Sequence, residues 1–263
     1  MARSRAKTLM RMLAVVAAGL VLGTAVFSGL VAAGVVPNPL APRLEGDVAL
    51  ARTDRPGLRV LFVGNSMTFA NGMPGLVHEL AAGDAGAQPL FAVAYTRPNW
   101  TLEGAAADRR LEHLFAEIRW NVVVLQENSR VAALPRDRRR SESEPFAAAL
   151  AARAANVGAE TLFFMTSPES ALELAAENGG SVAPVELAWR EARRRRPALD
   201  LTAWDGHHPN RAGSYLIACV FYAVLSGREA SGSVFAAGLP GDEARFLQRV
   251  ADDVVASRDW GAS

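Results

Sequence analysis

Short apolar runs alternate with longer amphipathic stretches along most of the chain. Apolar runs that end at glycine, proline or polar residues are typical of buried strands, whereas apolar residues spaced three and four apart indicate helices. The predicted strands cover residues 58–63, 90–95, 122–125, 161–165 and, as a short fifth strand, 198–203. The predicted helices cover residues 74–82, 102–118, 147–155, 184–195, 212–225 and 243–255.

This alternation of strands and helices predicts a parallel sheet with helices on both faces. The run 122–125 is apolar at every position, as expected for a strand that is buried on both faces. We therefore expect an α/β fold, a three-layer α/β/α sandwich around a central parallel sheet of the flavodoxin-like type.

The N-terminus carries a different pattern. Basic residues within 1–11 precede an uncharged apolar run over 12–36, which is the arrangement of a targeting segment. Because about 20 apolar residues span a bilayer, the run is long enough for an uncleaved signal anchor, that is, an N-terminal transmembrane helix, with a cleaved signal peptide as the alternative. The positive-inside rule then leaves 1–11 in the cytoplasm and exports the remainder.

The rest of the chain divides into two parts. Residues 37–56 are rich in proline and polar residues and are predicted to be a linker. Residues 57–263 are predicted to form one globular domain. We expect this domain to lie in the cell envelope, outside the cytoplasm and anchored to the membrane by the N-terminal helix, with a secreted or periplasmic protein as the alternative.

Composition narrows the classes of function. Half of the 263 residues are apolar and the formal net charge is +1, so a nucleic-acid partner is not indicated. The single cysteine, Cys219, excludes an internal disulfide and is predicted to lie in the core. The basic runs within 130–144 and 193–196 are predicted to be a solvated loop and a solvated helix end. Binding of an anionic substrate or of lipid headgroups is the alternative for each.

Candidate chemistry begins where the first strand of the domain ends. The stretch 61–68 reads Leu-Phe-Val-Gly-Asn-Ser-Met-Thr, so Ser66 lies at a turn from a strand to a helix. The carboxyl ends of the strands in an open α/β sheet are the usual place for an active site. The helix that follows offers backbone N–H groups to a developing negative charge. A serine that only caps the helix is the alternative.

A second polar cluster lies near the C-terminus. The stretch 204–209 reads Trp-Asp-Gly-His-His-Pro, with Asp205 three residues before His208. In a turn, this spacing lets the carboxylate accept a hydrogen bond from one ring nitrogen and leaves the other nitrogen for a nucleophile. A metal site is the alternative for two adjacent histidines, but neither His78 nor His113 has the spacing of a further ligand. We therefore expect no metal and no cofactor.

Together, Gly64-Asn65-Ser66 and Asp205-Gly206-His207-His208-Pro209 resemble the SGNH (GDSL-like) hydrolase superfamily. The resemblance covers roughly residues 58–225. It implies that Ser66 is the nucleophile, that His208 is the general base and then the acid, and that Asp205 orients His208. Asn65 stands where the family usually has aspartate, and His207 falls at a variable position.

The same resemblance implies an oxyanion hole made by the Ser66 N–H and by donors from two further loops. After the second strand, Pro98 and Asn99 stand where glycines are expected, and Asn99 is the candidate donor because proline has no N–H. After the third strand the sequence is Gln126-Glu127-Asn128, and either Gln126 or Asn128 is the second donor.

The resemblance implies a serine esterase that acts through an acyl-enzyme on acyl esters, with small acyl groups on glycans as one class of substrate. Two alternatives remain open, namely an acyltransferase that uses the same triad and a non-catalytic envelope binding protein. Trp100 and Trp204 flank the proposed site, where stacking on a sugar and packing in the core are the two interpretations.

Overall fold

We analysed a computed structural model, which describes Ser28 and residues 41–258. The chain divides into two units, Met1–Ala41 and Pro42–Ser263, and the architecture below is that of the second. The transmembrane segment predicted over 12–36 lies outside the described residues apart from Ser28. None of the helices in the described part combines the length and the apolar character needed to span a bilayer.

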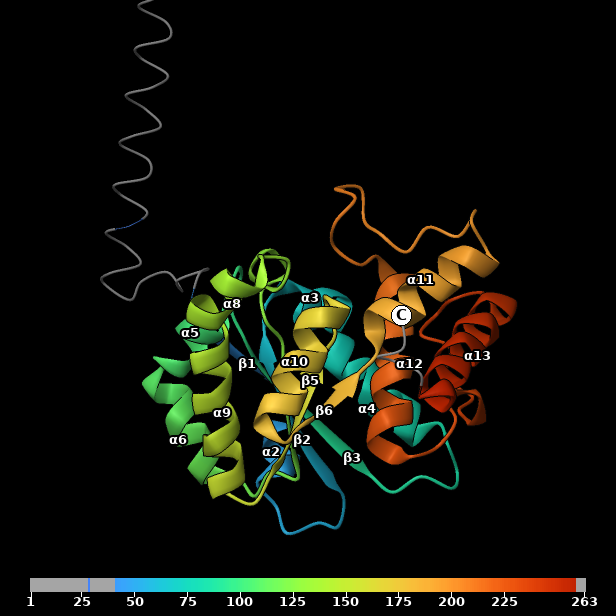
Figure 1. Cartoon of the computed structure of the whole chain (residues 1–263). Helices are drawn as coiled ribbons and strands as arrows, with labels where there is room; N and C mark the ends of the chain where they lie inside the picture. The colour runs from blue at the N-terminus through green and yellow to red at the C-terminus, as the bar shows by residue number, and fades with distance from the viewer. Residues whose placement is uncertain (1–27, 29–40, 259–263) are drawn as a thin grey trace, which may run out of the picture. The chain divides into compact units, whose positions relative to one another are not determined.

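The second unit is built on one six-stranded sheet (Figure 1). Its spatial order is β1-β3-β2-β4-β5-β6, in which the five strands from β2 onward are parallel and β1 is an antiparallel edge. Read in chain order, the parallel strands run 2-1-3-4-5, the flavodoxin-like order. This confirms the predicted α/β sheet. The strands are β1 (Arg43–Gly46), β2 (Leu58–Gly64), β3 (Leu90–Thr96), β4 (Val122–Leu125), β5 (Glu160–Phe164) and β6 (Ser181–Ala183).

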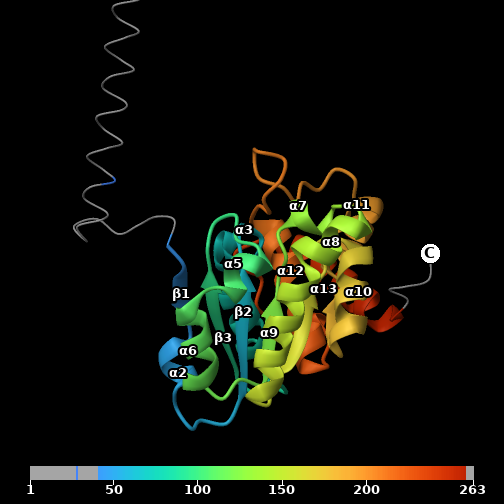
Figure 2. The ribbon, with the colours of Figure 1, turned by 60° about the vertical axis from the view of Figure 1, so that its left-hand side comes forward.

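Helices cover both faces of the sheet. Side chains alternate between the faces along each strand, and those on both faces are apolar and need to be buried. In β2, Val60 and Phe62 join one buried cluster while Leu61 and Val63 join the other. The first face carries α4 (Met73–Ala82), α11 (Val185–Arg195), α12 (Arg211–Ser226) and α13 (Gly241–Ser257). The second face carries α2 (Val48–Ala51), α5 (Leu102–Ala106), α6 (Arg109–Glu117), α9 (Glu144–Asn156) and α10 (Pro168–Asn178), and Figure 2 gives a second view of the arrangement. Cys219 is fully buried in α12, as predicted.

The C-terminal part of the sheet differs from the prediction. The stretch 198–203 is not a strand, since its only ladder contact is an isolated bridge between Thr202 and Pro209. The fifth parallel strand is β6, whose three residues are too few for a visible periodicity. Helix α10 was also missed. The predicted helix over 102–118 is two helices, α5 and α6, because Asp108 caps a new helix by accepting the Leu111 N–H at 2.8 Å.

The described part of the stretch predicted as a linker, residues 41–56, contributes β1 and α2. Asp47 fastens this segment to the sheet, because its carboxylate accepts the Ala92 N–H at 3.0 Å and lies 3.0 Å from His78 Nδ1. The edge strand therefore belongs to the folded unit.

The basic runs form helices with neighbouring acids. Residues 130–144 include most of α7 (Ser129–Ala132), all of α8 (Arg136–Glu142) and the first residue of α9 in place of the predicted loop. Buried Arg139 pairs with Glu169 and Glu173 of α10 at 3.0 and 2.6 Å. In the second run, Arg195 pairs with Glu191 and Asp253 at 2.5 Å. Arg139 is thereby paired inside the fold, whereas Arg193 and Arg194 stay exposed at the end of α11, as predicted for a solvated helix end.

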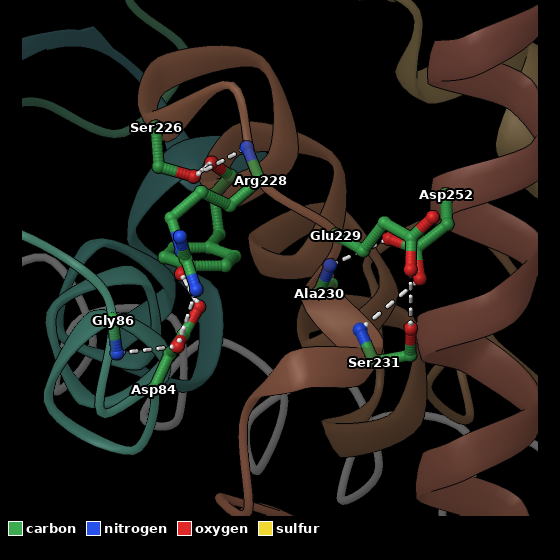
Figure 3. A network of polar contacts seen from close by, with 9 residues as sticks. Asp84, Gly86, Ser226, Arg228, Glu229, Ala230, Ser231 and Asp252 are labelled. Carbon is green, nitrogen blue, oxygen red and sulfur yellow. Dashed lines mark hydrogen bonds and ion pairs between the residues drawn. The ribbon is translucent and has the colours of Figure 1, made fainter.

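An ion pair with a buried carboxylate, Asp84, and a partly exposed arginine, Arg228, joins the loop after α4 to the loop after α12. Arg228 donates to both oxygens of Asp84, at 2.7 and 2.9 Å (Figure 3). The Tyr222 hydroxyl donates to the same carboxylate at 2.6 Å. Beside it, Asp252 accepts the N–H groups of Ala230 and Ser231 in η2 (Ala230–Gly232). These contacts fix the C-terminal helices on their face of the sheet.

Candidate active site

Ser66 is the first residue of α3 (Ser66–Phe69), directly beyond the carboxyl end of β2, and is half-buried. The turn before it is tight: a Cβ on Gly64 would come within 2.6 Å of Gln126 Oε1, so only glycine fits there. Asn65 then caps the helix, since its Oδ1 accepts the Met67 N–H at 3.2 Å. The local sequence thus aims the Ser66 hydroxyl out of the end of the sheet.

The second half of the site is the loop before α12. Its ends are held by the Ala203 N–H, which donates to the His208 carbonyl at 2.7 Å, and Gly206 adopts φ +67° at its tip. Asp205 Oδ1 accepts the N–H groups of His207 and His208, each at 3.0 Å. This is the local turn that aspartate side chains favour, and it fixes the carboxylate beneath the imidazole.

Ser66, His208 and Asp205 form a hydrogen-bonded series. His208 Nε2 lies 2.8 Å from Ser66 Oγ, across 142 positions of sequence, and His208 Nδ1 lies 2.6 Å from Asp205 Oδ2. Because the carboxylate accepts from Nδ1–H, the unprotonated Nε2 faces the serine hydroxyl. The hydrogen bond from His208, followed by those from the two backbone N–H groups, holds the pKa of Asp205 well below its usual value. The carboxylate therefore stays ionised, as an orienting group must.

A polar contact outside this hydrogen-bonded series holds the segment after Ser66 against the segment after His208. Asn71, in the short helix η1 (Ala70–Gly72), donates to the Pro209 carbonyl at 2.9 Å and to Ser214 Oγ at 2.8 Å. Asn71 adopts φ +53°, a left-handed conformation that asparagine tolerates better than most residues. Sequence reasoning missed this residue, although the pair Asn71-Gly72 is a turn signal close behind the serine.

The loop after β3 explains the residues that replace the expected glycines. The Trp100 N–H donates to the Arg97 carbonyl at 3.2 Å, with Pro98 second and Asn99, at φ +56°, third in the turn. This is a type II β-turn, which favours proline at the second position and requires a positive φ at the third. Asparagine here adopts the conformation that glycine would provide.

The two candidate oxyanion donors after β4 are in different environments. Gln126 is buried, its Oε1 accepts the Asn65 N–H at 2.8 Å, and its Nε2 donates to the Glu127 carbonyl at 2.7 Å. Asn128 is half-buried, and its Nδ2 donates to the Asn99 carbonyl at 3.3 Å. Gln126 therefore braces the serine turn, whereas Asn128 joins the Asn99 turn at the surface of the site.

Glu127, which the sequence did not single out, lies between these loops. It is 4% exposed, and its Oε1 accepts the N–H groups of Asn128 and Leu102 at 2.6 and 3.2 Å. Its Oε2 accepts the Ser143 hydroxyl at 2.6 Å. Burial raises the pKa of Glu127, while the hydrogen bond from Ser143 and then those from the backbone oppose this rise. One side chain thereby connects both candidate oxyanion loops to the start of α9.

The other residues that flank the site differ clearly in their burial. Trp100 is buried and packs edge-on against Tyr95, so it belongs to the core. The ring of His207 lies 4.9 Å from that of His208 and is exposed. Trp204 is 99% exposed. Within the described residues, no group of three or more His, Cys, Asp or Glu side chains is arranged to hold a metal ion.

Solved structures share this architecture. A DUF4886 family protein from Bacteroides uniformis matches with a TM-score of 0.67 at 15% identity, over 78% of this chain and 96% of its own. A candidate SGNH hydrolase from Slackia heliotrinireducens matches with a TM-score of 0.51 at 25% identity, over 64% and 98%. An acetylxylan esterase, Axe2, from Geobacillus stearothermophilus matches with a TM-score of 0.53 at 17% identity, over 66% and 95%.

No protein-family model and no curated protein matches the sequence. The family resemblance therefore depends on the two short motifs and on the fold. The sheet order, the position of Ser66 after β2 and the structural matches agree with the prediction made from those motifs. The chain has the fold of the SGNH (GDSL-like) hydrolases.

Proposed function

We propose that this protein is an exported serine esterase that hydrolyses acyl esters through Ser66, His208 and Asp205. The observation that carries the proposal is the 2.8 Å separation of His208 Nε2 and Ser66 Oγ, with the Asp205 carboxylate 2.6 Å behind the ring. A nucleophile, a base and an orienting group at these distances satisfy the requirement for nucleophilic catalysis. A serine that served only as a helix cap has no need of this partner.

In the proposed reaction Ser66 Oγ attacks the ester carbonyl carbon as its proton passes to His208 Nε2. The tetrahedral intermediate collapses, the ester C–O bond breaks, and the leaving alcohol takes the proton from His208. Water then attacks the acyl-enzyme while His208 accepts a proton, and return of that proton to Ser66 releases the acid. Asp205 stays ionised throughout and stabilises the imidazolium.

The proposed oxyanion hole consists of the backbone N–H groups of Ser66 and Asn99 and the side-chain amide of Asn128. Gln126 is buried and bonds to Asn65 and Glu127, so its role is to support the loops. Asn128 is half-buried at the surface of the site and uses one N–H of its amide on the Asn99 carbonyl. One such donor typically contributes about 3 kcal/mol to lowering the barrier.

Small acyl groups on glycans are the proposed substrate class, and the cell envelope is the proposed location. The fold match to an acetylxylan esterase supports the first, and the apolar N-terminal run supports the second. The side chains of His208 and Asp205 are 39% and 29% exposed, so water has access to the acyl-enzyme.

The test compares Ser66→Ala with Ser231→Ala in the full chain, using p-nitrophenyl acetate. We expect Ser66→Ala to lose at least about 10³-fold in kcat, as loss of a triad member does in serine hydrolases, and Ser231→Ala to match the wild type. Equal rates for all three proteins would remove the catalytic proposal and favour a binding protein. Acylated sugar among the products, when a sugar acceptor is added, would favour the acyltransferase.

A further inference from the structure

Trp204 differs from the other tryptophans of the described residues. It is 99% exposed, whereas Trp100, Trp120 and Trp189 are 5%, 2% and 8% exposed. Tryptophan is highly buried on average, because its ring carries a large apolar surface. An indole with its whole surface in water has no packing role in the fold, so a different reason for its position is needed.

The backbone at Trp204 is fixed to the catalytic series. The Gly206 N–H donates to the Ala203 carbonyl at 2.9 Å, which closes a turn around Trp204 and Asp205. The Ala203 N–H donates in turn to the His208 carbonyl at 2.7 Å. Adjacent Cα atoms are about 3.8 Å apart, so the indole starts one residue from the carboxylate that orients His208. The backbone that carries the ring is therefore held at a set position relative to Ser66.

The surroundings of Trp204 define the chemistry that suits it. Its neighbours Asp205, Gly206 and His207 are polar or small and are exposed. The other large apolar side chains that are exposed within the described residues, Val157 and Val234, lie in other segments, after α9 and after η2. A lipid chain or a membrane surface needs a wider apolar area than one ring. A sugar presents a flat C–H face of about the size of an indole and keeps its hydroxyls in water.

We propose that Trp204 is a sugar-binding subsite, on which a pyranose ring of an acylated oligosaccharide stacks while its ester reaches Ser66. This inference rests on the proposed esterase function and specifies its substrate. It assigns Trp204 to affinity for the sugar and not to the chemistry of the ester. Loss of the ring is therefore expected to affect large substrates selectively.

The test uses Trp204→Ala and Trp204→Phe in the full chain, with Val234→Ala as the matched control for loss of an exposed apolar side chain. With p-nitrophenyl acetate, we expect all variants to stay within about twofold of the wild type in kcat/KM, since no sugar is present. With acetylated xylo-oligosaccharides, we expect Trp204→Ala to raise KM about tenfold with kcat little changed. Trp204→Phe is expected to restore part of this loss, and Val234→Ala to match the wild type.

A binding measurement separates this inference from the proposed catalysis. In Ser66→Ala protein, acetylated xylo-oligosaccharides are expected to quench tryptophan fluorescence, and the quenching is expected to be lost in Ser66→Ala/Trp204→Ala. Quenching that persists, or equal losses on both substrates, would overturn the subsite. Binding to lipid vesicles that depends on Trp204 would overturn it in favour of a membrane contact. An inactive wild type with intact quenching would instead remove the esterase and retain the subsite.

Discussion

Asn71 donates a side-chain hydrogen bond to the carbonyl of Pro209, 2.9 Å away and 138 positions later in the chain. The two residues follow Ser66 and His208 respectively, so this bond connects the segment of the nucleophile to the segment of the base. Ser214 completes the connection, because it accepts from Asn71 and donates to the Ala70 carbonyl at 3.1 Å. The 2.8 Å contact between Nε2 and Oγ therefore has a structural support outside the triad.

Asn71→Gly tests this support. Glycine keeps the φ of +53° without strain but removes the side-chain amide. We expect kcat on p-nitrophenyl acetate to fall about tenfold or more, because His208 is then held less precisely relative to Ser66. Urea unfolding is expected to show a loss of about 1–3 kcal/mol, typical of broken side-chain hydrogen bonds. Asn178→Ala removes a comparable amide bond, to the Leu174 carbonyl in α10, and serves as the control. If both variants lose activity equally, the Asn71 contact has no specific role.

Asn99 provides a test of which atom donates to the oxyanion. We expect Asn99→Gly to keep most of the activity, because glycine preserves both the backbone N–H and the positive φ of the type II turn. Asn99→Val is expected to lose about 10²-fold in kcat, since a β-branched residue strains this conformation and displaces the N–H. Steady-state kinetics with p-nitrophenyl acetate give both numbers. A large loss in Asn99→Gly would assign the donor to the side chain instead.

Glu127 is expected to position the oxyanion loops without touching the substrate. Glu127→Gln replaces one carboxylate oxygen by an NH₂ group, which cannot accept the hydrogen bonds that Leu102, Asn128 and Ser143 donate to Glu127. We expect the oxyanion loops to shift, so that kcat falls with little change in KM. Ser143→Ala removes only the contact to α9 and is expected to keep kcat within about threefold of the wild type. The midpoint of thermal unfolding of each variant shows whether its lower kcat is explained by a loss of stability alone. A rise in KM with unchanged kcat in Glu127→Gln would contradict the positioning role.

The sequence predicted the elements whose pattern is local. The strand before Ser66 and the turn around Asp205 are visible because apolar runs, glycines and motif residues lie within a few positions of each other. The stretch 198–203 was misread because Leu199 and Leu201 pack into the buried cluster on the first face of the sheet and do not form a strand. A Cβ on Gly213 would lie 2.2 Å from the Leu201 carbonyl, which shows how closely that loop lies on the helix.

Contacts between distant segments could not be predicted in the same way. Nothing in the stretch Gln126-Glu127-Asn128 tells which side chain turns inward, and only the packing of α5 and α9 makes Glu127 the buried acceptor. The role of Asn71 depends likewise on a partner 138 positions away. The motifs identified the candidate nucleophile and base, whereas the residues that hold them together required the fold.

The ion pair of Asp84 and Arg228 leads to a prediction about acid stability. The hydrogen bond from Arg228, followed by those from Tyr222 and the Gly86 N–H, holds the pKa of Asp84 far below its usual value. An aspartate in the unfolded chain titrates near pH 3.9. Because folding depresses this pKa, the stabilisation is fully present above about pH 4 and is lost as the pH falls through the folded-state pKa.

Asp84→Asn replaces the titratable carboxyl group by an amide. The difference in free energy of unfolding between wild type and variant should therefore depend on pH. We expect the gap in the free energy of unfolding, measured with urea, to be large and constant from pH 7 to pH 5. It should narrow below about pH 4, because the unfolded wild type then takes up a proton at Asp84 that the folded protein does not. Glu117→Gln is the matched control, because Glu117 pairs with Arg52 at 2.9 Å but both side chains are about half exposed. Exposed pairs contribute about 0–1 kcal/mol, so this variant should stay close to the wild type at neutral pH. A gap for Asp84→Asn that does not change between pH 7 and pH 3.5 would mean that folding does not lower the pKa of Asp84.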